Sequence, residues 1–307
     1  MEYHSSQMNK VYVLSPVEDW IVDRFVKEWN EDNSDISVLH PKDANVIWLL
    51  ADWAWNHLAL QGYLNNKKVL TTVHHIVPEK FKEEEIENFL IRDRFTTAYH
   101  VYNQQTANFI SRFTQKPIFL ISYWANQKIW KKTGDKKELR QKHGLPQDSF
   151  LVGSFQRDTE GHDLISPKLE KGPDLLADYL EDLKSKRQNL HVVLAGWRRQ
   201  YIIERLKQAQ ISFTYFERPS QETINDLYQT LDLYPVSSRC EGGPQALIEC
   251  GLLEIPTITR DIGIARQVLS QTSINDDLSK ACPGIPNVES WKLPFGYQPY
   301  RTLLLSI

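Results

Sequence analysis

Two glutamates near the end of the sequence have unusual surroundings for carboxylates. Glu241 lies in the turn CEGGP, and Glu249 lies eight positions later inside the apolar segment ALIECGLL. A proline at residue 244 suits the start of a helix and another at residue 256 ends one, so we expect a helix from about residue 244 to residue 254. Its face around Glu249 is mostly apolar, where a carboxylate is costly unless hydrogen-bond donors reach it. The paired hydroxyls of a ribose would supply such donors. The alternative is that Glu249 reaches solvent and Glu241 is an ordinary loop charge.

The backbone that follows Glu241 offers a place for an anion. Gly242 and Gly243 allow a ligand to approach the main chain closely, and Pro244 leads directly into the expected helix. The N-terminus of a helix attracts negative charge through its unpaired N–H groups. We therefore expect residues 242–244 to form an anion-binding corner.

These residues must be positioned by a fold in which strands and helices alternate. The segments KVYVLS, ANVIWLL, KKVLTTVHHI, AYHVYN and PIFLISYW are typical of strands in the first half, and SFLVGSF, NLHVVLAG, ISFTYFE, LDLYPVSS and PTITRD are typical of strands in the second. Between them lie helical patterns, among them VEDWIVDRFVKEW with Trp20, Ile21, Phe25 and Trp29 on one stripe, HLALQGYL, and KGPDLLADYLEDLKSKR. Continuous apolar strands separated by helices indicate parallel sheets that are covered on both faces.

The chain divides near its middle. The stretch KKTGDKKELRQKHGLPQDS is polar, charged and interrupted by Gly and Pro, as a linker would be. We expect an α/β fold with two Rossmann-like doubly wound domains that face a cleft, covering residues 1–145 and 146–285. The last segment, 286–307, contains a short helical pattern and is expected to cross back to the N-terminal domain.

Ligands of doubly wound domains bind beyond the carboxyl ends of the strands. This rule selects a short set of side chains at the predicted strand ends: Ser15, Asp52, His74 and His75 in the first domain, and Arg157, Gly196, Glu217 and Glu241 in the second.

Composition narrows the class of protein. The 307 residues are 41% hydrophobic and 24% charged, and the net charge of −3 argues against a nucleic-acid-binding protein. Three irregularly spaced cysteines indicate reduced thiols, the first ten residues have no apolar signal region, and no apolar run approaches the length of a membrane span. We expect a soluble, cytoplasmic protein. The basic run 128–142 is either a solvated linker or a site of peripheral membrane contact.

The two glutamates and their context resemble a known signature. Glu241–x7–Glu249, followed by CGLLEIPTITRDIG, resembles the E-x7-E pattern of GT-B glycosyltransferases in family 4. Upstream, FLVGSFQR…LEKGPDLL resembles the strand, Arg, Glu-Lys-Gly and helix of that family, and HVVLAG resembles its strand that ends in glycine, here Gly196. The resemblance covers most of residues 145–270 and extends only loosely into the first domain.

This resemblance implies a retaining transferase that uses a nucleotide-diphosphate sugar, UDP- or GDP-linked, with no metal and no further cofactor. It implies that Glu249 binds the ribose, that Glu241 and the backbone at 242–244 hold the donor sugar, and that two cations neutralise the diphosphate. Arg157 and Lys171 match that basic pair. Lys168 is an alternative to Lys171, because the loop 158–170 is longer than usual and its path cannot be predicted.

In the first domain, VLTTVHHI resembles the family's strand that ends in a histidine near the transferred sugar, which favours His74 over His75. The acceptor would be a saccharide, a lipid-linked molecule or a small molecule. Trp53 and Trp55 would stack on a sugar ring or belong to the core. The usual Gly-rich loop after the first strand is replaced by SPVEDW, which argues against a phosphate-bearing acceptor bound at that loop. Two alternatives stay open, an epimerase that acts on a nucleotide sugar and a non-catalytic nucleotide-sugar-binding protein.

Overall fold

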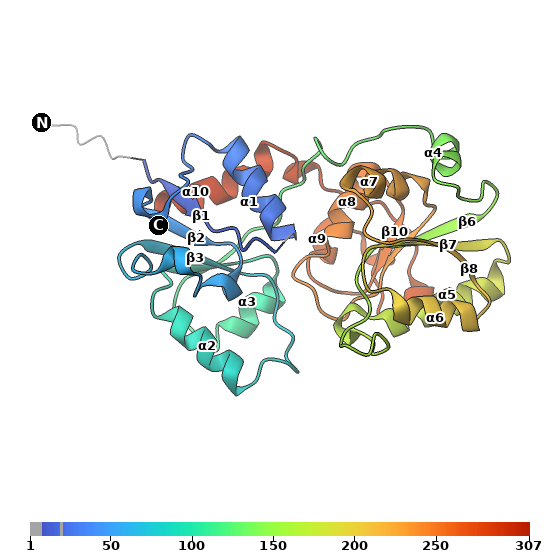
Figure 1. Cartoon of the computed structure of the whole chain (residues 1–307), viewed down its shortest axis with the longest axis horizontal. Coiled ribbons are helices and arrows are strands. Elements are labelled where there is room, and N and C mark those ends of the chain that lie inside the picture. The colour runs from blue at the N-terminus through green and yellow to red at the C-terminus, as the bar shows by residue number, and fades with distance from the viewer. Residues whose placement is uncertain (1–7, 19–20) are drawn as a thin grey trace, which may run out of the picture. The chain divides into compact units, whose positions relative to one another are not determined.

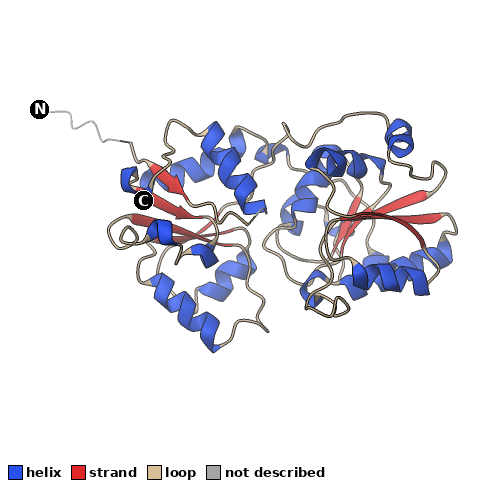
Figure 2. Cartoon of the chain, viewed as in Figure 1, coloured by secondary structure: helices blue, strands red, loops and turns tan. Residues whose placement is uncertain are grey.

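The computed structural model describes residues 8–18 and 21–307, and the chain divides into two compact units. Unit 1 comprises the chain up to Trp124 together with Pro294–Ile307, and unit 2 comprises Ala125–Leu293. In each unit, strands lie between layers of helices (Figure 2). The predictions for the first seven residues and for Trp20 lie outside the described residues.

Unit 1 is built on a fully parallel sheet of order β1-β2-β3-β4-β5. Its strands are β1 (Val11–Val13), β2 (Val46–Leu49), β3 (Lys68–Val73), β4 (Ala98–Val101) and β5 (Ile118–Leu120). An isolated parallel bridge also joins Val11 to Ser37, on the edge of β1 opposite to β2. The chain is thus wound in both directions from β1, as expected for a doubly wound domain.

Helices cover both faces of this sheet. They are α1 (Ile21–Asp32), α2 (Glu83–Asp93), α3 (Gln104–Ile110) and α10 (Gln298–Ser306). Helices α1 and α10 lie on one face and α2 and α3 on the other (Figure 1). Trp29 of α1, Trp48 of β2 and Tyr300 of α10 are fully buried and pack ring against ring. The Tyr300 hydroxyl donates to the Ser122 carbonyl oxygen at 2.9 Å, so the returning C-terminal segment completes the core of unit 1.

The segment HLALQGYL does not form the expected α-helix. It contains one 3₁₀ turn at Leu58–Leu60 and then further turns, and Gly62 adopts φ +79°. Of its apolar side chains only Leu60 is buried, while Leu58 is 76% exposed. Without an apolar face to bury, the segment gains too little from packing to stabilise a helix.

The strands of unit 2 are also parallel. They are β6 (Phe150–Ser154), β7 (Leu190–Ala195), β8 (Ser212–Phe216), β9 (Tyr234–Val236) and β10 (Thr257–Thr259). The bridge Val152–Leu233 places β9 beside β6, so the strands follow in the order β8-β7-β6-β9-β10. Strand order reverses between β6 and β9, and doubly wound sheets bind their ligands at such a switch point.

The helices of unit 2 are α4 (Lys136–Lys142), α5 (Pro173–Lys186), α6 (Gln200–Gln208), α7 (Gln221–Thr230), α8 (Gln245–Leu253) and α9 (Ala265–Val268). Helices α5 and α6 lie on one face of the sheet, and α7 and α8 on the other (Figure 1). Helix α5 packs on the sheet through Leu176 and Leu180, which are buried in the same cluster as Val192 of β7.

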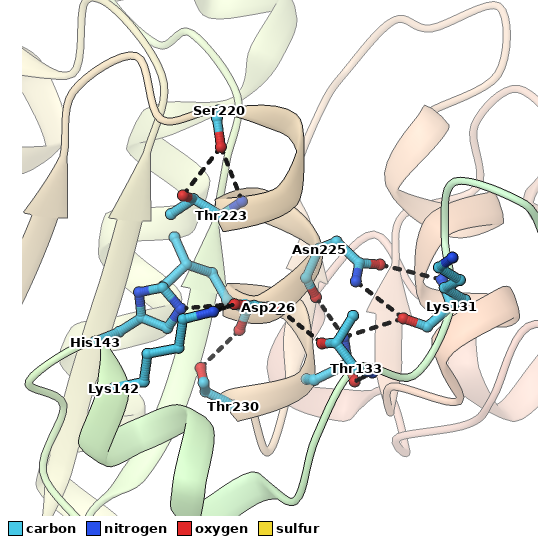
Figure 3. Close-up of polar contacts among 11 residues, drawn as sticks. Lys131, Thr133, Lys142, His143, Ser220, Thr223, Asn225, Asp226 and Thr230 are labelled. Atoms are coloured by element: carbon cyan, nitrogen blue, oxygen red, sulfur yellow. Dashed lines mark hydrogen bonds and ion pairs between the residues drawn. The ribbon is translucent and has the colours of Figure 1, made fainter.

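The polar stretch expected to be a linker is attached to unit 2 (Figure 3). Asp226 of α7 is buried, and its carboxylate accepts hydrogen bonds from Thr133 Oγ1 at 2.7 Å, Lys142 Nζ at 2.6 Å and His143 Nε2 at 3.0 Å. Burial alone would raise the pKa of Asp226, but these hydrogen bonds outweigh it and hold the pKa below its ordinary value. The units therefore divide at residues 124–125, before this stretch, and the expected boundary near residue 145 falls inside unit 2.

Candidate active site

The two loops that leave the switch point of unit 2 are tied together by one glutamine. Gln156 follows β6, and its Nε2 donates to the Lys171 carbonyl oxygen at 2.8 Å. Its Oε1 accepts from Ser238 Oγ, two residues beyond β9, at 3.2 Å. Gln156 was not among the residues predicted from the sequence, because nothing in its neighbourhood shows that β6 and β9 become adjacent.

Where these two loops meet, two of the predicted site residues form an ion pair. Lys171 Nζ lies 2.5 Å from Glu241 Oε1, although the residues are 70 positions apart in the chain. Ser238 Oγ donates to the same carboxylate oxygen at 2.9 Å. The side chain of Lys171 is 22% exposed and that of Glu241 is 11% exposed, so the pair is partly accessible to a ligand.

A close backbone approach holds Lys171 in this position. Gly172 adopts φ +60°, and a Cβ atom there would lie 2.1 Å from the Ser237 carbonyl oxygen. The backbone N–H groups of Arg239 and Cys240 both donate to the Glu170 carbonyl oxygen. Glycine is required at residue 172 for its conformation and for its lack of a side chain.

Glu249 lies within α8 and is 8% exposed. Its Oε2 accepts a hydrogen bond from the hydroxyl of Tyr228, on α7, at 2.6 Å. Burial, and then the nearby carboxylate, raise the pKa of the Tyr228 hydroxyl well above its ordinary value, so the hydroxyl keeps its proton and donates. Tyr228 lies 21 residues upstream on another helix, so this protein partner of Glu249 was not predicted from the sequence.

The expected anion-binding corner, residues 242–244, directly precedes α8, and the helix begins one residue later than expected. Pro244 is the residue before the helix, with ψ 115°, and α8 begins at Gln245. Gly242 and Gly243 are buried. Gly263, at φ +51°, approaches so closely that a Cβ atom there would lie 2.9 Å from the Gly242 carbonyl oxygen.

Arg157 and Lys168 have separate surroundings at the end of β6. Arg157 Nε donates to the Thr159 carbonyl oxygen at 3.0 Å, and its guanidinium carbon lies 5.4 Å from the centroid of the Trp197 ring. Lys168 Nζ lies 3.5 Å from Glu170 Oε1. Of the two candidate lysines, Lys171 is the one that contacts Glu241.

Gly196 follows β7 at φ +97°, and its N–H donates to the Phe216 carbonyl oxygen at 3.1 Å.

The loop after Arg157 is anchored by a pair that the sequence did not reveal. Arg199 and Asp158 form an ion pair of 2.5 Å, and both side chains are completely buried. Arg199 also donates to the Ala195 carbonyl oxygen at 2.7 Å. The pair fixes the loop after β6 against the end of β7.

In unit 1, His74 directly follows β3. Its Nε2 donates to the Leu50 carbonyl oxygen at 2.8 Å, which assigns the ring proton to Nε2 and leaves Nδ1 as an acceptor. Burial lowers the pKa of His74 below its ordinary value, so the ring is neutral at pH 7. The ring centroid lies 5.9 Å from that of Trp53, which is 40% exposed.

The remaining strand-end residues of unit 1 have protein partners. Asp52 forms an ion pair of 3.0 Å with Arg92, and the Ser15 hydroxyl donates to Asp23. Trp55 packs against Phe95, with 5.8 Å between ring centroids.

Two further findings concern the described residues as a whole. Among residues 8–18 and 21–307, no three His, Cys, Asp or Glu side chains gather closely enough to hold a metal ion. None of the helices in the same residues has the length and apolar character that a membrane span needs.

Comparison with known proteins supports the architecture and the class of enzyme. Residues 135–276 match the family model described as glycosyl transferases group 1. No match was found among curated proteins.

Solved structures match over most of the chain. The structure of Anabaena HepE in complex with UDP and glucose is 13% identical, with 87% of this chain and 84% of that chain covered at a TM-score of 0.69. Sucrose-phosphate synthase from Thermosynechococcus elongatus is 16% identical, with 82% and 64% covered at a TM-score of 0.59. WaaG, a glycosyltransferase involved in lipopolysaccharide biosynthesis, is 13% identical, with 84% and 82% covered at a TM-score of 0.59.

The expected fold is therefore confirmed as the α/β fold of GT-B glycosyltransferases. Together with the family match in unit 2, it identifies the chain as a glycosyltransferase.

Proposed function

We propose that this enzyme transfers a sugar from a nucleotide-diphosphate sugar to an acceptor hydroxyl, with retention of anomeric configuration and without a metal ion. The observation that carries the proposal is the contact between Lys171 and Glu241 at the switch point of unit 2. It joins the Glu-Lys-Gly segment to the first glutamate of the E-x7-E pattern, and both were selected from the sequence for the same donor.

The cations in this region suit a departing diphosphate. When the bond between the sugar and the phosphate breaks, negative charge develops on the diphosphate, and fixed positive groups stabilise it. Lys171 is held at 2.5 Å from Glu241, and Arg157 lies at the end of the neighbouring strand β6. In this proposal both residues contact the diphosphate, and no metal ion is needed for charge neutralisation. Lys168 stays the alternative to Lys171.

The carboxylates divide the rest of the donor between them. Glu241 and the backbone at residues 242–244 hold the sugar, and Glu249 binds the ribose hydroxyls. The Tyr228 hydroxyl occupies one oxygen of Glu249 and orients the carboxylate before the nucleotide arrives. A group that is already oriented loses less conformational entropy on binding.

His74 is proposed to act on the acceptor side. Its neutral ring offers Nδ1 as a hydrogen-bond acceptor for a sugar hydroxyl. The acceptor would be a saccharide, a lipid-linked molecule or a small molecule. A UDP-sugar donor is supported by the structures of HepE with UDP and glucose and with UDP-glucose. Location in the cytoplasm, expected from the scattered cysteines, stays a prediction.

The test is a panel of UDP-, GDP- and ADP-sugars, with release of nucleoside diphosphate as the readout and NMR of the product to assign its anomeric configuration. Lys171→Ala should lower turnover by at least about a hundredfold, which corresponds to the loss of one charge-stabilising group in the transition state. Glu241→Gln should also lower turnover, because Glu241 is proposed to hold the transferred sugar. Lys186→Ala is the matched control, because Lys186 forms a 2.6 Å pair with Asp182 on the exposed surface of α5. It should keep full activity.

Two results would overturn the proposal. If the wild-type enzyme returns an epimerised donor without transfer, the reaction class is wrong. If Lys171→Ala and Lys186→Ala have the same turnover as the wild type, the switch-point pair is not the donor site.

A further inference from the structure

Three arginines surround one tryptophan at the carboxyl ends of neighbouring strands in unit 2. The distance from the guanidinium carbon to the centroid of the Trp197 ring is 5.4 Å for Arg157, 4.6 Å for Arg198 and 4.9 Å for Arg218. Arg157 follows β6, Arg198 follows β7 and Arg218 follows β8, and these strands are adjacent in the sheet. The strand order thus gathers three positive charges at the edge where this fold binds its ligands.

Carboxylates within the described residues do not neutralise this cluster. Across residues 8–18 and 21–307, Arg218 makes no hydrogen bond or ion pair, and the same is true of the adjacent, exposed Glu217. Arg198 donates from Nη1 to the Gly161 carbonyl oxygen at 2.8 Å, and its Nε is buried with no partner. By contrast, Arg199 is fully paired with Asp158. Three unneutralised guanidinium groups repel one another, and an anionic ligand would relieve this repulsion.

The backbone of the cluster is also unusual. Arg198 has φ +55° and Arg218 has φ +48°, which is unfavourable for residues with a Cβ atom. Such conformations persist where the surrounding structure requires them, and they are frequent at ligand sites. Here they occur in two loops that both place an arginine beside Trp197.

The tryptophan adds a second requirement for the ligand. Trp197 is 42% exposed, so the indole is accessible although three guanidiniums lie near it. An exposed indole binds the flat face of a planar ring, and guanidinium groups both stack on rings and donate to acceptors in their plane. The ligand should therefore combine a planar ring with negative charge, as a nucleoside diphosphate does.

We infer that Trp197 and Arg218 form the binding site for the base of the donor nucleotide, with Arg157 between the base and the diphosphate. This inference rests on the proposed function and adds the choice of base. A guanidinium only donates hydrogen bonds, so it pairs with ring edges that carry carbonyl oxygens. Uracil and guanine present such oxygens, whereas adenine presents an amino donor beside its ring nitrogen. The site should accept UDP or GDP and discriminate against ADP.

Calorimetric titration of UDP, GDP, ADP and inorganic pyrophosphate into the full-length protein tests this inference. Trp197→Ala should weaken binding of the preferred nucleoside diphosphate by about tenfold or more, the loss typical for one base that stacks on an aromatic ring. Trp197→Phe should keep most of the affinity, because it retains a flat ring. Arg218→Ala should reduce the preference of UDP or GDP over ADP. Binding of pyrophosphate should be unchanged in the two Trp197 variants, and in Arg218→Ala it should weaken less than binding of UDP or GDP does.

The matched control is Arg187→Ala. Arg187 also lies over an aromatic ring, 4.3 Å from the centroid of Phe150, at the start of β6 and thus at the opposite end of the sheet. It should bind every ligand as the wild type does.

Variants whose ligand-free melting temperature equals that of the wild type are taken to fold normally. Among those, unchanged UDP and GDP affinity in both Trp197→Ala and Arg218→Ala would overturn the inference. An equal loss for pyrophosphate would also overturn it, because the cluster would then bind phosphate and not the base. A wild type that binds none of the nucleoside diphosphates would instead overturn the proposed function itself.

Discussion

Replacing Tyr228 with Phe removes one buried hydroxyl and leaves the ring packing of α7 intact. The hydroxyl is the donor to Glu249 Oε2 at 2.6 Å, and Tyr228 itself is 1% exposed. A hydrogen bond to a charged group contributes about 1.5–3 kcal/mol. For a unit of this size, 1 kcal/mol corresponds to about 2–4 °C in Tm. We therefore expect Tyr228→Phe to lower the Tm of the ligand-free protein by roughly 3–12 °C.

The same variant should affect the nucleotide less than a change at Glu249 does. If Glu249 binds the ribose, Glu249→Ala should weaken binding of nucleoside diphosphate by about ten- to a hundredfold. Tyr228→Phe leaves the carboxylate in place but less firmly oriented, so its loss of affinity should be smaller. Glu249→Gln, which keeps an oxygen for Tyr228, should melt closer to the wild type than Glu249→Ala does.

The assay combines ligand-free thermal melts with calorimetric titration of nucleoside diphosphate into the three variants. Tyr99→Phe is the control, because Tyr99 is also buried and its hydroxyl also donates to a carboxylate, Asp93 Oδ1 at 3.1 Å, but in unit 1. It should cost stability without the same loss of nucleotide affinity. If Glu249→Ala binds nucleotide normally and yet melts far below the wild type, Glu249 is structural and its assignment to the ribose fails.

Three further predictions concern the metal, acid stability and the backbone at the switch point. Turnover should survive an excess of EDTA, and loss of activity that magnesium or manganese restores would exclude metal-independent transfer. The folded-state pKa of Asp226 lies below its ordinary value of 3.8, so the ionised carboxylate stabilises the folded protein above that pH, and this stabilisation is lost as the pH falls through the folded-state pKa. Thermal melts of the wild type from pH 7 to pH 3 should show this loss. An identical pH profile in Asp226→Asn would contradict the prediction. Gly172→Ala should lower stability by more than the roughly 1–2 kcal/mol of a left-handed residue, because its Cβ atom would meet the Ser237 carbonyl oxygen. Gly144→Ala shares the positive φ but has open space, so equal denaturation midpoints for the two glycine variants would show that the close approach is unimportant.

Much of the fold could be predicted from the sequence because burial leaves a local pattern. A strand covered on both faces is continuously apolar, as in β7, and a helix on a sheet carries a stripe, as in α5. Glu241 could be located in the same way, because it stands in a Gly-Gly-Pro turn, whereas Lys171 was selected from the resemblance of its segment to a family motif. The local pattern gave a wrong prediction for HLALQGYL, where apolar residues are present but only Leu60 is buried.

The sequence by itself therefore determined the class of fold, the strand ends and the residues available for a donor site. Only the tertiary structure decided which of these residues meet. Tyr228 reaches Glu249 because α7 and α8 lie on the same face of the sheet, and the arginines reach Trp197 because β6, β7 and β8 are neighbours. Residue periodicity records how deeply each side chain is buried, whereas strand order, on which these contacts depend, arises from packing between distant segments and leaves no local pattern.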